Sequence, residues 1–95
     1  MKIALERKLI EAKELTELLI NELLYLKENI EADCLPDEIE YITMLKEKIL
    51  DDYDRVSKVK VIPYLAGSIG NVNELLDHLY YRQTLVLKIL KACNL

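Results

Sequence analysis

Apolar residues recur at steps of three and four through residues 2–30, which is the spacing of one face of an α-helix. This stripe consists of Leu5, Leu9, Ala12, Leu19, Leu23, Leu26 and Ile30, with Thr16 filling one gap. It is widened by four further apolar residues, Leu15, Leu18, Ile20 and Leu24. A two-stranded coiled coil needs a narrower seam. We therefore expect a first helix over about residues 2–32 that contacts two neighbouring helices rather than one.

A second helix is predicted over about residues 36–61. Pro36 cannot continue the first helix but suits the first turn of a new one. The acidic side chains of Asp37 and Glu38 then lie near the positive end of the helix dipole. The apolar positions again follow steps of three and four, and they are Ile39, Ile42, Leu45, Ile49, Tyr53 and Val56.

The uncharged segment 61–71 separates the second helix from a third. Pro63 and two glycines favour a loop over about residues 62–70. Asn71 followed by Glu74 has the spacing of a capping box, which predicts that the third helix covers about residues 72–93. Its expected buried face is Val72, Leu75, Leu76, Leu79, Val86, Ile89, Leu90 and Cys93. Asn94 is a suitable terminator for this helix.

The composition favours a single all-α domain. The chain has 95 residues, only two glycines and two prolines, and neither Trp nor Phe, so its core must be aliphatic with Tyr as the one aromatic type. Sheets would require more turn residues. We expect an elongated antiparallel three-helix bundle with coiled-coil-like packing. A chain of this size often gains stability by association, and we expect this one to self-associate.

The net charge of −4, from 17 acidic and 13 basic residues, gives no basic surface for nucleic acid or anionic lipid. No apolar run approaches the length of a membrane span, and the first residues are too charged for a signal peptide. A cytoplasmic location is the expectation. Cys34 and Cys93 suit reduced thiols better than a disulfide framework, and the topology places both at one end of the bundle.

The last third of the chain is unusually apolar. Residues 61–95 contain two acidic and three basic residues, and apolar positions lie on more than one side of the third helix. Two neighbouring helices would not cover them all, which predicts a homo-oligomer or a protein partner on this surface. The candidate interface residues are Leu79, Leu85, Val86, Leu87 and Leu90.

One polar group of the third helix could carry chemistry. At helical spacing Glu74, His78, Tyr81 and Arg82 share a face. As a binding site, Arg82 would hold a carboxylate or phosphate while His78 moves protons and Tyr81 positions the ligand. As structure, Glu74 would pair with His78, and Arg82 would meet an acid of a neighbouring helix. The candidate ligand residues are Ser68, Asn71, His78, Tyr81 and Arg82.

Catalysis is not expected. A chain with one histidine cannot assemble a familiar His/Cys zinc site, no serine, threonine or cysteine has an activating context, and no cofactor motif occurs. The preferred function is a non-catalytic cytosolic interaction or assembly module, such as a homo-oligomer, an adaptor, a chaperone-like protein or an inhibitor. The alternative is a binder of a small anionic ligand or nucleotide, with pockets at subunit interfaces near residues 67–82.

Overall fold

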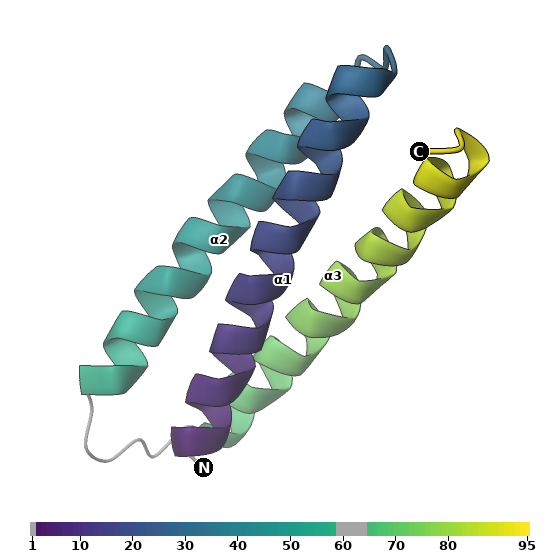
Figure 1. The fold of residues 1–95 in the computed structure, drawn as a ribbon. Coiled ribbons are helices and arrows are strands. Elements are labelled where there is room, and N and C mark those ends of the chain that lie inside the picture. The colour runs from purple at the N-terminus through teal and green to yellow at the C-terminus, as the bar shows by residue number, and fades with distance from the viewer. Residues whose placement is uncertain (1, 59–64) are drawn as a thin grey trace.

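Three long helices run up, down and up along one axis (Figure 1). The structure, a computed structural model, describes residues 2–58 and 71–95 in full and the backbone alone of residues 65–70. The helices are α1 (Lys2–Asn29), α2 (Leu35–Lys58) and α3 (Leu65–Ala92), and no strand occurs in these described residues. The molecule measures 48 × 18 × 15 Å. The predicted elongated all-α three-helix bundle is therefore confirmed.

The helix α1 lies between the other two and supplies half of the buried apolar side chains in the described residues. Its buried side chains follow the predicted stripe, and they are Leu5, Leu9, Ala12, Leu15, Thr16, Leu19, Leu23 and Leu26. Thr16 is the one buried polar residue among those that the structure describes. Its hydroxyl donates a hydrogen bond to the carbonyl oxygen of Lys13 at 2.6 Å, so the buried donor has a partner. Because α1 packs against both α2 and α3, the prediction of two neighbours is confirmed, although Leu18 and Leu24 stay exposed.

The first turn of α2 has the polarity expected for a helix start. The amide of Glu38 donates to the carbonyl oxygen of Cys34 at 3.0 Å, and Asp37 and Glu38 are acidic residues of the first turn. Ile42 and Ile49 are fully buried, and the other predicted core residues of this helix are half-buried. The predicted last residues of this helix, 59–61, and positions 62–64 of the predicted loop lie outside the described residues.

The predicted start of the third helix is wrong. The helix α3 begins at Leu65, so residues 65–70 are helical where a loop was expected. Asn71 lies inside the helix and does not cap it. Each glycine in a helix costs only about 1 kcal/mol, and an exposed asparagine such as Asn71 costs less than that in a helix interior. Two glycines and a capping-box pattern were therefore too weak to stop the helix.

The end of α3 is a Schellman motif at Asn94. This residue has φ of 58°, and its amide donates to the carbonyl oxygen of Lys91 at 3.1 Å. The amide of Leu95 donates to the carbonyl oxygen of Leu90 at 2.9 Å. These two bonds satisfy carbonyl groups that the helix itself leaves open. The sequence prediction that Asn94 terminates the helix is confirmed.

The helices α2 and α3 both pack on α1, but their backbones do not come close to each other in the described part of the chain. Figure 1 shows α3 diverging from the other two helices toward its C-terminal end. The core therefore has one shared helix and two flanks. The contacts between α2 and α3 are made by long side chains.

Candidate functional site

Four polar side chains bridge α2 and α3. Arg82 of α3 forms an ion pair through Nη1 with Oε1 of Glu38 on α2. Its Nε also donates to Nε2 of His78 at 2.8 Å. The hydroxyl of Tyr41 on α2 lies 3.2 Å from the same His78 nitrogen. We call Glu38, Tyr41, His78 and Arg82 the bridging cluster.

The geometry of the bridging cluster determines which nitrogen of the neutral His78 ring carries the proton. Arginine can only donate, so the Nε2 atom of His78 must accept and the ring proton must sit on Nδ1. The guanidinium carbon of Arg82 lies 4.6 Å from the centroid of the Tyr41 ring, a cation–π contact. The Tyr41 and His78 rings meet edge to face, with centroids 6.1 Å apart.

The charges of the bridging cluster already balance. Glu38 neutralises Arg82, and both side chains are only about one-quarter to one-third exposed, at 30% and 27%. An external anion would have to displace Glu38 to reach the guanidinium, which leaves a partly buried carboxylate without its partner. The bridging cluster therefore links α2 to α3 and leaves no unpaired cation in the cluster for an external anion.

The structure brings together two of the five predicted ligand residues. His78 and Arg82 are in direct contact. Tyr81 is 64% exposed, and within the described residues no hydrogen bond joins it to the cluster. Asn71 lies apart and lines a cavity. The side chain of Ser68 is outside the described part of the structure.

The sequence predicted two structural contacts for the polar face of α3, and one of them is present. Arg82 does meet an acid of a neighbouring helix, as expected. The expected pair of Glu74 with His78 does not occur among the described ion pairs and hydrogen bonds, since Tyr41 and Arg82 take its place. Sequence reasoning missed Tyr41. The available signal was its position three residues after Glu38, on the same side of α2.

Two of the five predicted interface residues cannot serve that purpose. Leu79 is 0% exposed and Val86 is 7% exposed, since both belong to the core that α3 forms with α1. Their heptad positions are used within the chain, which corrects the expectation for these two. Leu85 and Leu87 are exposed, and Leu90 is half-buried.

A different apolar row is exposed on α3. Tyr81, Leu85 and Ile89 follow one another at four-residue spacing, so they lie on adjacent turns of one side. Leu85 is 40% exposed and Ile89 is 42% exposed. We call these three residues the α3 stripe. Tyr81, predicted as a ligand residue, belongs to this stripe.

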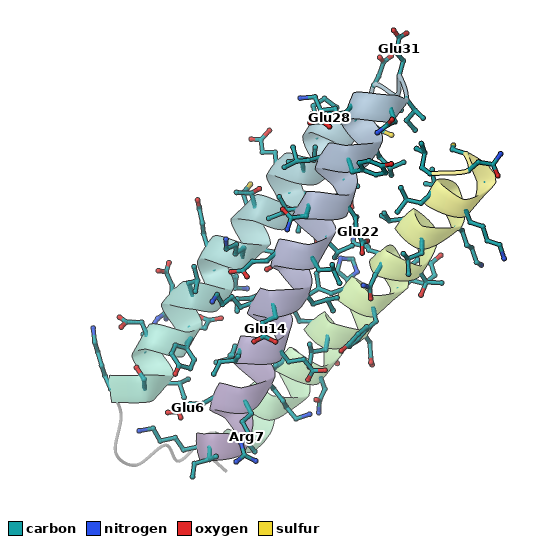
Figure 2. All side chains as sticks on the ribbon, viewed as in Figure 1. Glu6, Arg7, Glu14, Glu22, Glu28 and Glu31 are labelled. Carbon is teal, nitrogen blue, oxygen red and sulfur yellow. The ribbon has the colours of Figure 1, made fainter. Side chains whose placement is uncertain are left out.

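Polar contacts also join α1 to α3. The phenol of Tyr80 donates to Oε1 of Glu11 at 2.6 Å, and this bond raises the pKa of Tyr80 because it stabilises the protonated phenol. Glu22 lies between α1 and α3 (Figure 2). Burial raises the pKa of the Glu22 carboxyl, a hydrogen bond from Gln83 lowers it, and the buried Oε2 has no partner in the described residues.

The exposed side of α1 carries both acidic and basic residues. Figure 2 shows the labelled acids along this helix, from Glu6 near the N-terminus to Glu28 and then Glu31 beyond the helix end. Glu14 and Glu28 are exposed. Arg7 is the labelled base among them. This face has the character of a solvated surface, in contrast to α3.

The two cysteines, Cys34 and Cys93, are free and exposed. They lie at the same end of the bundle, because the connection from α1 to α2 and the end of α3 are both at that end (Figure 1). No group of three or more His, Cys, Asp or Glu residues in the described ranges is arranged to hold a metal ion. None of the helices, as far as the structure describes them, is long and apolar enough to cross a membrane.

Comparisons with models of protein families, with curated proteins and with solved structures gave no match for this chain.

Proposed function

We propose that this chain is a non-catalytic assembly module that forms a homodimer through α3. The observation that carries the proposal is the α3 stripe. It consists of Tyr81, Leu85 and Ile89 on successive turns of a helix that packs its backbone against only one neighbour. An apolar row of this kind is typical of a helix that has a further partner.

The charges on α3 favour a second copy in the antiparallel direction. The exposed acids Glu74 and Asp77 precede the stripe, and the exposed bases Lys88 and Lys91 accompany its end. Two α3 helices in parallel would place like charges side by side. An antiparallel pair would place the acids of one chain near the bases of the other. Such pairs at the rim are individually weak, but they select orientation.

A twofold axis close to Leu85 would pair the apolar row with itself and would bring Asp77 of one chain within about one helical turn of Lys91 of the partner subunit. Leu85 would then face its own copy, and Tyr81 would face Ile89 of the partner subunit. This is an isologous interface, in which one patch is complementary to itself. The charged outer side of α1 would remain in solvent, as its exposed residues Arg7, Glu14 and Glu28 favour.

The proposal places the dimer in the cytosol. It is supported by the free and exposed state of Cys34 and Cys93, which a reducing compartment maintains. Such a module would hold two copies, or two proteins attached to them, at a fixed distance and orientation.

The first experiment measures mass by light scattering coupled to size exclusion. The wild-type chain is expected at twice its 11.1 kDa, and Leu85→Glu is expected at the monomer mass, because it buries a charge at the centre of the interface. Met44→Glu is the matched control, since Met44 is 61% exposed on α2 and outside the stripe. A monomeric wild type into the high micromolar range contradicts the proposal, as does equal disruption by both variants.

A charge exchange tests the orientation. One variant carries Glu74→Lys with Asp77→Lys, and a second carries Lys88→Glu with Lys91→Glu. Each alone would juxtapose like charges and is expected to dimerise less than the wild type. Mixing the two is expected to give a heterodimer, and this preference should weaken with added salt. Heterodimers no more frequent than chance would refute the antiparallel arrangement.

A further inference from the structure

The seam between α2 and α3 contains a cavity of about 330 Å³, which the bridging cluster does not fill. The cavity exists because the two backbones stay apart, so that side chains of α1 form its floor. Leu9, Ile49 and Val72 contribute to this floor from α1, α2 and α3 respectively, and all three are buried. Its volume is at the lower end of the range for small-molecule sites.

The margin of this cavity is polar and carries a net positive charge. Lys48 and Arg55 are seven residues apart on α2, so they lie on the same side of that helix. Asp52 also lines the cavity and pairs with Arg55 at 3.5 Å, so the three charged side chains at the margin sum to one positive charge. Lys48 takes part in none of the ion pairs of the described residues. The Lys48 ammonium is therefore a cationic group at the margin of an apolar cavity.

We infer that this cavity binds a single-chain amphiphile with an anionic carboxylate head, such as a medium-chain fatty acid. The hydrocarbon chain would lie on the apolar floor, where each methylene removed from water adds to the affinity. The carboxylate would lie at the margin beside the Lys48 ammonium and the side-chain amide of Asn71. A nucleotide fits poorly, because its several phosphate charges would meet one uncompensated cation and its base would meet a floor without hydrogen-bonding groups.

The test compares decanoate with decanol, below the concentrations at which either forms aggregates, by isothermal titration calorimetry. The two ligands have the same chain and differ in head-group charge. The wild type is expected to bind decanoate more tightly. Lys48→Ala is expected to weaken decanoate about tenfold and to leave decanol unchanged, since it removes one charge-assisted contact. Lys88→Ala, a change of the same kind on α3 and away from the cavity, is the matched control.

A second variant tests the location independently of charge. Leu75 is half-buried and lines the cavity, so Leu75→Trp is expected to occupy the space and to abolish binding of both ligands. Circular dichroism checks that this variant keeps its helices. If it does not fold, the comparison of Lys48→Ala with Lys88→Ala decides alone.

Three outcomes would overturn the inference. These are no decanoate binding by the wild type, equal loss of decanoate affinity in Lys48→Ala and Lys88→Ala, or normal binding by a folded Leu75→Trp variant. The inference is independent of dimer formation, because the cavity lies within one chain. The monomeric Leu85→Glu variant should therefore bind decanoate as the wild type does, and a loss of binding there would assign the ligand to the α3 stripe instead.

Discussion

The Nε atom of Arg82 donates to Nε2 of His78 at 2.8 Å, and the same guanidinium pairs with Glu38 on the facing helix. A single arginine thus holds a residue of its own helix and an acid of α2. The contact joins two helices whose backbones do not approach each other. The seam between α2 and α3 is consequently held by side chains and not by close backbone packing.

The first prediction concerns the ring proton of His78. Because Arg82 donates to Nε2, the neutral imidazole should carry its proton on Nδ1. Nitrogen-15 chemical shifts of the labelled histidine at neutral pH measure this directly. In Arg82→Met the constraint is removed, and we expect the Nε2-protonated form to become populated. A wild-type ring protonated on Nε2 would contradict the described contact.

The second prediction concerns the energetic coupling between Glu38 and Arg82. A double-mutant cycle with Glu38→Gln and Arg82→Met is expected to give about 1 kcal/mol, because the pair is partly exposed and water screens it. Urea unfolding at one protein concentration provides the four free energies of unfolding. The pair Lys58 and Asp54, which is much more exposed, serves as a comparison and should give a smaller coupling. Equal values would mean that burial adds nothing at the seam.

The third prediction separates core from surface on α3. Leu79→Ala should lower the free energy of unfolding by about 3 kcal/mol, since it opens a cavity beside α1. Leu87→Ala removes the same atoms from a side chain that is 49% exposed, and it should cost under about 1 kcal/mol. Urea unfolding measures both. Similar costs for the two variants would show that Leu87 is as covered as Leu79.

The fourth prediction is a pH dependence that arises from Glu22. Burial raises the pKa of this carboxyl in the folded chain, so its ionised form destabilises the fold. Glu22→Gln should therefore be more stable than the wild type at neutral pH. The difference should shrink as pH falls through the raised pKa of the folded state, and it should vanish below the unfolded value.

The control for Glu22 is Glu14→Gln, a change at an exposed position of the same helix. Subtracting each variant from the wild type at every pH removes the titration of all other groups. A gap between wild type and Glu22→Gln that widens on acidification would reverse the sign of the effect and refute the burial argument.

The fifth prediction concerns the phenol of Tyr80. Its hydrogen bond to Glu11 raises the pKa of Tyr80, so the bond stabilises the fold below the ordinary phenol pKa and is lost as pH rises through the raised one. Nuclear magnetic resonance of the Tyr80 ring follows this titration. Glu11→Gln should move it to lower pH, while Glu14→Gln should leave it in place. An unchanged titration in Glu11→Gln would mean that the carboxylate has no role.

Periodicity was sufficient to predict α1 because one face of that helix is buried along almost its whole length. Leu5, Leu19 and Leu26 all lie where the steps of three and four place them. The start of α3 could not be predicted in the same way. The segment 65–70 has the residues of a loop, and its helical state is a continuation of the long helix that follows it.

The bridging cluster was only partly predictable. The four-residue spacing predicted that His78 and Arg82 share a face, and the structure adds that they contact each other. Tyr41 and Glu38 lie on another helix, and their alignment with α3 depends on how α2 and α3 each pack on α1. Pairs of residues that lie far apart in the sequence leave no periodic signal, so such contacts could not be predicted from it. The α3 stripe was hidden for a related reason, because only the packed structure shows that Leu79 and Val86 are used inside the chain while Leu85 is not.

The central position of α1 also ranks the helices by how readily they can detach. Removing α1 would dismantle the whole core. In the described residues α2 and α3 each pack their backbones on α1 alone, but α3 diverges from α1 toward its C-terminal end. We therefore expect α3 to open before α2, and its amide hydrogens should exchange with solvent before those of the α1–α2 hairpin. A binding partner that covers α3 would slow that exchange, which links association to the lifetime of the native chain.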